Sequence, residues 1–156
     1  MAKQLVERPF VAEQGRAGQG RAGQREGFRC PNSRRILTDM IGELRSVVLD
    51  CPDPDSLASF YEQLLGMERI INEDDWVALQ KTGGGIRVAF QQVDDYTPPQ
   101  WPGQVVPQQS HFDIRVDDLD AGEAQVLAIG ARDAGYREDD FRVFLDPAGH
   151  PFCLVS

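Results

Sequence analysis

The stretch that decides the fold is DCPDPDSLASFYEQLLGM, residues 50–67. It overlaps an alternating, β-branched run at 44–51 that predicts a strand. Asp53 is a favoured helix-capping residue and Gly66 is typical of a helix end, so a helix is predicted over 53–66. Apolar side chains at helical spacing give that helix one face suited to burial, made of Leu57, Phe60, Tyr61, Leu64 and Leu65.

The rest of the chain continues this beginning and then repeats it. Strands predicted at 67–71, 76–82 and 86–92 complete a β-α-β-β-β module spanning 44–92. After a proline-rich connection at 94–107, the same plan returns in a second module spanning 109–156. Its strands are predicted at 110–116, 131–136, 141–146 and 151–155, with a helix at 117–130. We therefore expect an α+β fold of paired β-α-β-β-β modules that form a curved mixed sheet around a cleft, with the helices outside.

Alternation along the strands predicts which side chains look into that cleft. Positions beneath the helices must be apolar, so the intervening positions face inward. They form a polar surface suited to a ligand, made of Ser46, Asp50, Arg87, Gln91, His111, Asp113, Arg115 and Cys153.

Residues 1–40 differ from the remainder in charge and composition. They carry eight basic and four acidic residues and repeat the pentad GRAGQ at 15–19 and 20–24. Without apolar periodicity, they predict a disordered basic leader, the alternative being an arm for nucleic acid. Met40 stands just before the first strand, and translation that begins there would omit the leader. The folded domain is then expected over 41–156.

The composition of that domain narrows the classes of partner. Residues 41–156 hold 21 acidic and eight basic residues, a balance that repels nucleic acid and anionic membranes. No apolar run approaches the roughly 18 residues that span a bilayer. Three widely spaced cysteines fit a reducing cytoplasm better than a disulfide scaffold. We expect a cytoplasmic protein with a small-molecule ligand or a protein partner, and neither nucleic acid nor membrane.

Three segments carry a resemblance to a known superfamily. Residues 50–67, HFDIRVDDLDA (111–121) and DPAGHPFCLV (146–155) resemble, in order and spacing, the glyoxalase-like branch of the vicinal oxygen chelate superfamily. That superfamily includes glyoxalase I, bleomycin-resistance proteins and extradiol dioxygenases. The resemblance implies paired modules that are often assembled across a homodimer. In the enzymes it also implies a divalent metal in the cleft, which polarises vicinal oxygens of the substrate.

Carried over by position, the metal site of the superfamily is incomplete in this chain. The first-strand ligand, usually His or Gln, falls on Ser46, and the last-strand Glu falls on Cys153. The fifth-strand His is retained as His111, while the remaining ligand falls on Ala89 or Gln91. The resemblance thus leaves His111, Gln91 and Cys153 as the candidate metal set, and these are few strong donors for a catalytic metal.

The individual residues have alternative roles. His111 is a ligand, a base or a hydrogen-bonding group, and Asp113 either orients it or pairs with an arginine. Cys153 is a thiolate ligand or a small buried filler. Trp101 and Tyr96, in the connection, either wall a pocket or pack between modules. His150, in a Gly-His-Pro turn, receives no role.

Two functions remain open, and the short ligand set favours the first. In it, the cleft binds a small organic molecule without a complete catalytic metal site, through His111, Asp113, Arg115, Arg87, Gln91 and Trp101. In the second, the protein is a metal-dependent lyase, isomerase or dioxygenase of the superfamily.

Overall fold

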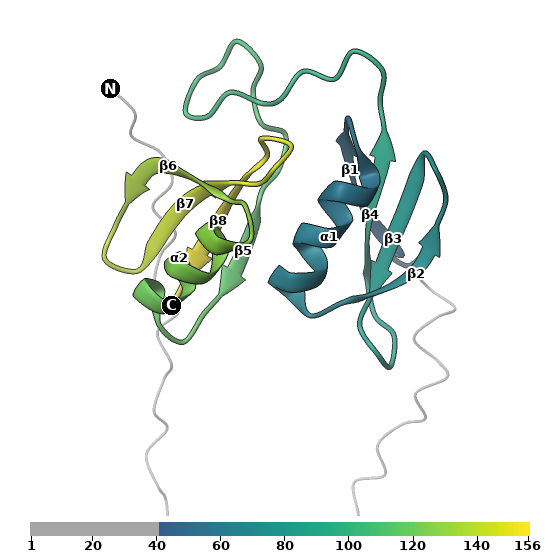
Figure 1. The fold of residues 1–156 in the computed structure, drawn as a ribbon, viewed down its shortest axis with the longest axis horizontal. Coiled ribbons are helices and arrows are strands. Elements are labelled where there is room, and N and C mark those ends of the chain that lie inside the picture. Colours follow the sequence, from purple (N-terminus) through teal and green to yellow (C-terminus); the bar gives the residue numbers. More distant parts are fainter. Residues whose placement is uncertain (1–40) are drawn as a thin grey trace, which may run out of the picture. The chain divides into compact units, whose positions relative to one another are not determined.

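Two β-α-β-β-β modules make up the part of the chain that the computed structural model describes, residues 41–156 (Figure 1). The first module comprises β1 (Ser46–Cys51), α1 (Pro54–Leu65), β2 (Glu68–Asn72), β3 (Trp76–Gln80) and β4 (Arg87–Gln92). The second comprises β5 (Phe112–Arg115), α2 (Leu119–Ala128), β6 (Arg132–Arg137), β7 (Phe141–Leu145) and β8 (Pro151–Val155). The predicted leader and Met40 lie outside the described residues.

The order of elements confirms the prediction, with small shifts at their ends. The strand predicted at 110–116 is shorter, since β5 begins at Phe112 and leaves His111 just before it. The strand predicted at 86–92 begins one residue later, since β4 starts at Arg87, and Ile86 before it is 49% exposed. Strands that are slightly shorter than predicted are expected, because backbone pairing weakens at strand ends.

Each module folds into its own four-stranded sheet with the same strand order. Sheet A has the order β1-β4-β3-β2 and sheet B the order β5-β8-β7-β6. In both, the first strand pairs in parallel with the last, and the remaining pairs are antiparallel. Figure 1 shows each sheet with its helix lying along one face. The repeated topology confirms that one structural plan occurs twice.

Both helices begin at an aspartate that accepts backbone hydrogen bonds. Asp53 accepts from the N–H of Ser56 at 3.1 Å, and Asp118 accepts from the N–H groups of Asp120 and Ala121 at 2.8 and 3.0 Å. Helix α1 ends at Gly66, whose φ of 60° lies in the left-handed region that glycine tolerates best. Neither α1 nor α2 has the length and apolar character needed to cross a bilayer.

Helix α1 lies between the two sheets, which corrects the expectation that the helices are outside. On one side the Tyr61 ring stacks on Phe90 of β4, with centroids 5.2 Å apart. On the other side Phe60 contacts Phe152 of β8 at 5.9 Å, and Tyr61 contacts Phe112 of β5 at 5.9 Å.

This arrangement has a direct physical reason. The apolar faces of both sheets contribute to one continuous buried cluster. Helix α1 lies inside this cluster and contacts both sheets. Packing these faces against each other removes more apolar surface from water than packing the polar faces would. The polar faces of sheets A and B, which we call the open faces, therefore point away from each other within residues 41–156.

Candidate functional site

The open face of sheet B brings together three chemically active side chains. Asp113 of β5 is the direct neighbour of Cys153 on β8, and His111 precedes Asp113 by two residues on the same face. The nitrogen, oxygen and sulfur atoms that these side chains offer all lie within 4.8 Å of one another. His111 Nε2 lies 3.4 Å from Asp113 Oδ1, so the carboxylate can orient the imidazole.

The thiol of Cys153 is held in its protonated form. Its burial, together with the charge and hydrogen bond of Asp113, raises the pKa of Cys153 to about 12. The nucleophilic form of cysteine is the thiolate, so at neutral pH this group is a weak nucleophile. The cluster therefore supplies a hydrogen-bonding surface and a base, and lacks an activated sulfur.

The remaining predicted site residues divide between the two sheets. Arg115 follows Asp113 on the open face of sheet B. Arg87 and Gln91 lie on β4, on the open face of sheet A, where Arg87 is the neighbour of Ser46 and Gln91 the neighbour of Asp50. The chain thus assembles His111, Asp113, Arg115 and Cys153 on one sheet, and Arg87 and Gln91 on the other.

The metal site implied by the superfamily matches this chain only in part. Ser46 offers a neutral hydroxyl, and Ala89 is fully buried and has no donor atom. His111, Asp113 and Cys153 offer one nitrogen, one oxygen and one sulfur, a set that suits Zn²⁺, whose ligands lie roughly 2.0–2.3 Å from the ion. Such an ion would have to displace the thiol proton. Gln91, predicted as a ligand, lies on sheet A and is not part of this cluster.

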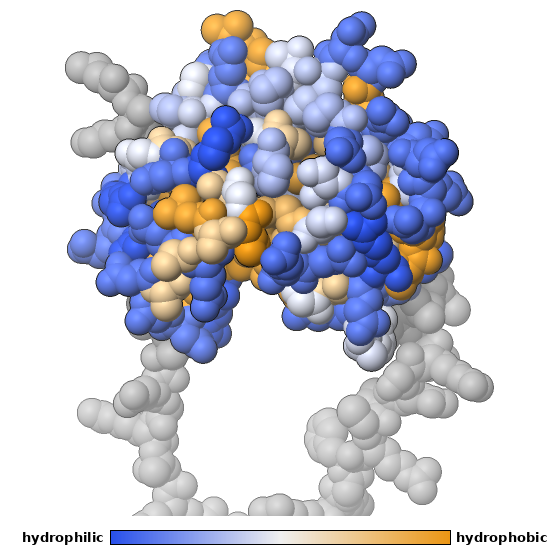
Figure 2. Space-filling view, in the orientation of Figure 1, coloured by the Kyte–Doolittle hydropathy of each residue, from blue (hydrophilic) through white to orange (hydrophobic). Residues whose placement is uncertain are grey.

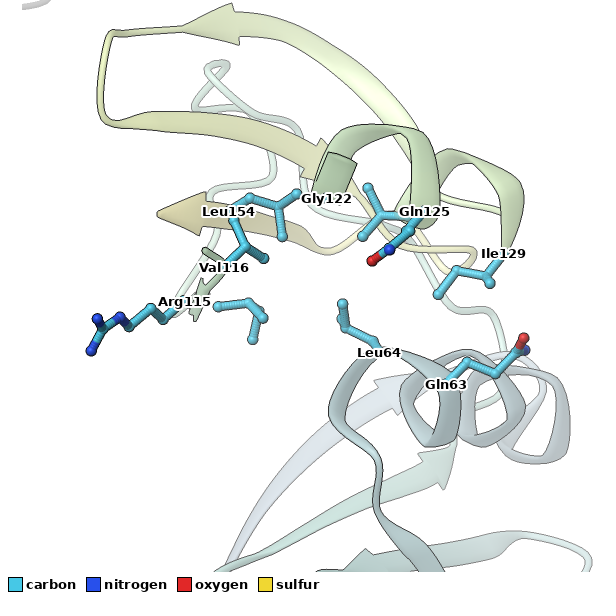
Figure 3. Close-up of a pocket in the computed structure, with 10 residues that line it drawn as sticks. Gln63, Leu64, Arg115, Val116, Gly122, Gln125, Ile129 and Leu154 are labelled. Carbon is cyan, nitrogen blue, oxygen red and sulfur yellow. The ribbon is translucent and has the colours of Figure 1, made fainter. Parts of the chain in front are cut away.

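A groove on the opposite side of sheet B lies between the two helices. It has a volume of about 330 Å³ and is lined mainly by apolar side chains, among them Leu64, Val126, Ile129 and Leu154. Figure 3 shows Gln63 and Leu64 of α1 across from Gln125 of α2 and from Ile129, which follows α2, while the guanidinium of Arg115 points away from the groove. Figure 2 shows hydrophobic residues exposed toward the middle of this view, bordered by hydrophilic ones. The groove is separate from the polar cluster on the open face.

Trp101 of the connection contributes to an aromatic surface that the sequence did not reveal in full. Its ring meets Tyr136 of β6 edge to face, with centroids 5.5 Å apart and planes at 89°. Tyr136 in turn stacks on Phe141 of β7, at 5.8 Å and 28°. We call Trp101, Tyr136 and Phe141 the aromatic ledge. Register places it on the open face of sheet B, since Tyr136 neighbours Val143 and Val143 neighbours Cys153.

A buried polar network links the connection to the core, and sequence reasoning missed it. Asp146 is fully buried and accepts hydrogen bonds from the Tyr61 hydroxyl at 3.0 Å and the His150 backbone N–H at 2.9 Å. His150 Nδ1 lies 2.9 Å from the same carboxylate, and His150 Nε2 lies 3.1 Å from the Tyr96 hydroxyl. Burial and the nearby Asp146 raise the pKa of both tyrosines, which keeps them protonated.

His150 therefore has a structural role where the sequence assigned none. The available signal was the spacing of Asp146 and His150, four residues apart across a Pro-x-Gly turn. That spacing allows a side chain to bond the backbone and ring of the residue that closes the turn. The partners Tyr61 and Tyr96 are too distant in sequence for any local pattern to indicate them.

Solved structures with the same architecture come from several organisms. A glyoxalase/bleomycin resistance protein/dioxygenase family enzyme from Burkholderia phytofirmans is 19% identical, with a TM-score of 0.54, over 72% of this chain and 97% of that one. The fosfomycin resistance protein FosX from Mesorhizobium loti is 18% identical, with a TM-score of 0.56, over 74% and 92%. A possible glyoxalase from Bacillus cereus is 9% identical, with a TM-score of 0.56, over 73% and 98%.

The sequence itself identifies the family. No curated protein matches the chain. Residues 46–155, which contain both modules, match the glyoxalase-like domain family. Together with the duplicated topology, this match shows that the chain belongs to the glyoxalase-like domain family of the vicinal oxygen chelate superfamily.

Proposed function

We propose that this protein is a cytoplasmic binding protein for a small organic molecule, which it holds on its open sheet faces without requiring a catalytic metal. The observation that carries the proposal is the polar surface of sheet B, where His111, Asp113 and Arg115 are exposed to solvent. These groups can hydrogen-bond or pair with a ligand, and the aromatic ledge beside them offers apolar contact. The raised pKa of the Cys153 thiol favours binding over nucleophilic chemistry by this sulfur.

A second copy of the chain would complete the cleft. Because α1 lies between the sheets, the open faces within one chain cannot enclose a ligand between them. Strands β1 and β5 each form one of the two edges of their sheets, and edge strands offer unpaired backbone groups to a partner. In the proposed homodimer, β1 of one copy adjoins β5 of the other, and Arg87 and Gln91 of the partner face His111 and Asp113.

The dimer is tested by sedimentation together with ligand titration. We expect a dimer at micromolar concentration, and ligand affinity that falls as dilution dissociates it. A monomer that binds its ligand with undiminished affinity would contradict the shared cleft.

Metal-independent binding is tested with a library of small organic compounds that covers acids, bases and neutral molecules. Ligand-observed NMR and thermal shift are measured with the protein in excess EDTA. We expect compounds that bind in EDTA and that lose affinity in His111→Ala. Lys81→Gln serves as a control, since Lys81 lies in the turn between β3 and β4 and carries no site role. Loss of all binding in EDTA would refute the proposal.

A metal-dependent lyase, isomerase or dioxygenase is the second candidate, because His111, Asp113 and Cys153 place three ligand atoms within 4.8 Å. A cation there would act as a Lewis acid on substrate oxygens. Asp113 and Cys153 would hold it together with His111, and substrate would take the open position. Elemental analysis decides between the candidates: one equivalent of zinc or iron that disappears in His111→Ala would favour the enzyme.

A further inference from the structure

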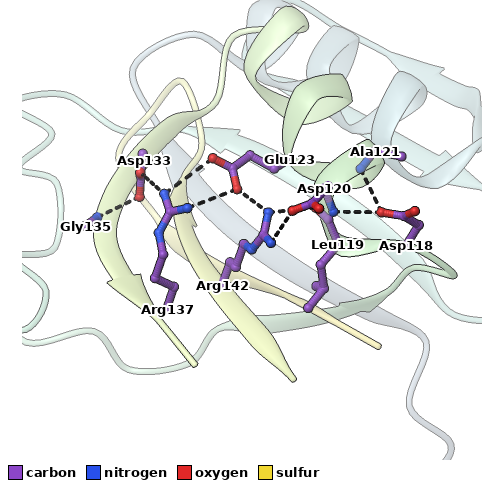
Figure 4. A network of polar contacts seen from close by, with 9 residues as sticks. All are labelled: Asp118, Leu119, Asp120, Ala121, Glu123, Asp133, Gly135, Arg137 and Arg142. Carbon is purple, nitrogen blue, oxygen red and sulfur yellow. Dashed lines mark hydrogen bonds and ion pairs between the residues drawn. The ribbon is translucent and has the colours of Figure 1, made fainter. Parts of the chain in front are cut away.

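Three arginines within the strands, Arg69, Arg137 and Arg142, point to the helix side and are engaged in ion pairs. Arg69 pairs with Asp55 and Glu62 of α1. In the second module, Arg137 and Arg142 both pair with Glu123 of α2, as Figure 4 shows. Further partners of these two arginines are Asp133 and Asp120. Their acidic partners already occupy these three guanidinium groups, which makes them weaker sites for a ligand anion.

The arginines on the open faces are different. Arg87, Arg115 and Arg132 form no ion pair with any residue between 41 and 156. Register assigns Arg132 to the open face of sheet B, because it neighbours Leu145 and Leu145 neighbours Pro151. This domain holds 21 acidic residues against eight basic ones, so acidic partners are abundant. A guanidinium without an ion-pair partner remains available to an anion, although Glu68 on the open face of sheet A and Glu138 at the edge of sheet B add to the carboxylates of Asp50 and Asp113.

On the open face of sheet B, the strand register also fixes how far the backbone of Arg115 lies from the aromatic ledge. Arg115 neighbours Val155, and Val155 neighbours Phe141, so the three lie in one row across the sheet. Adjacent strands are about 4.8 Å apart, which places the backbone of Arg115 roughly 10 Å from that of Phe141. Between them lies the small apolar side chain of Val155. A ligand that contacts both Arg115 and the aromatic ledge must therefore reach across this face from β5 to β7.

The aromatic ledge offers a rigid, accessible surface for a planar group. Tyr136 is 43% exposed, and its hydroxyl donates to Glu138 Oε1 at 2.8 Å, which holds the ring in place. Its contacts with Trp101 and Phe141 order it from both sides. Planar apolar groups stack or meet edge to face with such rings. The carboxylate of Glu138 lies at this end, so an anionic group is expected to point away from it, toward β5.

We propose that the ligand of this face is an aryl-alkyl anion: its planar ring lies on the aromatic ledge, and its carboxylate or phosphonate pairs with Arg115. This inference rests on the proposed binding function and names its ligand class. Arg115 is suited to the anionic group because a guanidinium binds carboxylates and phosphonates through two parallel hydrogen bonds. Asp113 does not compete strongly for it, since its carboxylate faces His111 and Cys153.

The test uses three probes with the same ring and chain: phenylpropanoate, its neutral amide and phenylethylphosphonate. Affinities are measured by calorimetry for the wild type, Arg115→Gln, Tyr136→Leu and the control Lys81→Gln. We expect Arg115→Gln to weaken the binding of at least one anion by about tenfold or more, and to leave the amide within about twofold. Tyr136→Leu should weaken all three probes, and Lys81→Gln none. Relative affinities of carboxylate and phosphonate identify the anionic group.

Two results would overturn the inference. Equal binding of amide and anions, or anion binding unaffected by Arg115→Gln, would show that Arg115 does not select charge. Absence of binding by all three probes would also reject this ligand class, once circular dichroism confirms that each variant is folded. The compound library separates this failure from that of the proposed function: bases or neutral molecules would still bind if only the ligand class is wrong, whereas no compound would bind if the function is wrong.

Discussion

Replacing Tyr61 with phenylalanine tests the buried polar network that joins the two modules. Tyr61 is 1% exposed, and its hydroxyl donates to the fully buried Asp146 at 3.0 Å. The substitution keeps the ring, and with it the contacts to Phe90 and Phe112. It removes only one of the hydrogen bonds to a buried carboxylate, which typically contributes about 1.5–3 kcal/mol. We expect the free energy of unfolding to fall by about 2 kcal/mol.

The assay is equilibrium unfolding in urea, followed by circular dichroism, with calorimetry for the melting temperature. For a folded unit of this length, 1 kcal/mol corresponds to about 4 °C, so the melting temperature should fall by about 8 °C. Tyr136→Phe is the matched control. Its hydroxyl also donates to a carboxylate, that of Glu138 at 2.8 Å, but this pair is exposed and solvent screens it, so Tyr136→Phe should lower stability much less than Tyr61→Phe.

The reasoning fails if the two substitutions have equal effects. A loss below about 0.5 kcal/mol in Tyr61→Phe would mean that Asp146 does not depend on this donor. His150→Phe, combined with Tyr61→Phe, then measures the coupling directly. A network that shares one carboxylate should give a non-additive double variant, whereas independent sites would add.

Three further predictions concern the turn, a thiol and a helix end. Gly149 has a φ of +97°, and a Cβ there would lie 2.8 Å from Pro98, whereas a Cβ at Gly84, with a φ of +101°, meets nothing within 4 Å. Gly149→Ala should therefore destabilise the fold in urea by at least about 1 kcal/mol more than Gly84→Ala; equal losses would exclude the contact with Pro98. The pKa of Cys153, raised to about 12, makes a contribution to stability that is complete below the ordinary thiol pKa and lost as pH rises through the folded value. Between pH 8 and 10 the unfolding free energy should fall in the wild type and fall by about 1 kcal/mol less in Cys153→Ser, a figure reduced for the partial exposure of the thiol. Parallel pH profiles of the two proteins would contradict this. Asp118→Ala removes the acceptor for two N–H groups of α2 and should cost about 1 kcal/mol; no change in urea midpoint would show that solvent replaces the cap.

Much of each module was predictable because the signals are local. The caps at Asp53 and Asp118, the helix end at Gly66 and the alternation along β5 depend on neighbours a few residues away. The same alternation correctly placed Asp113 and Cys153 on one face, because the apolar positions of β5 and β8 identify the side that packs against a helix. Of the three residues of the aromatic ledge, only Trp101 was named from the sequence, because Tyr136 and Phe141 lie in strands whose pairing includes a register shift.

The sequence by itself determined the duplicated β-α-β-β-β plan, the polar and apolar faces of each strand and the family to which the chain belongs. Only the tertiary structure decided that α1 lies between the sheets and that the open faces point apart. Periodicity shows that a face is apolar but does not show which partner covers it, and α1 could have packed on sheet A alone. The bond between Tyr61 and Asp146 spans 85 residues, so it exists only once the two modules have docked.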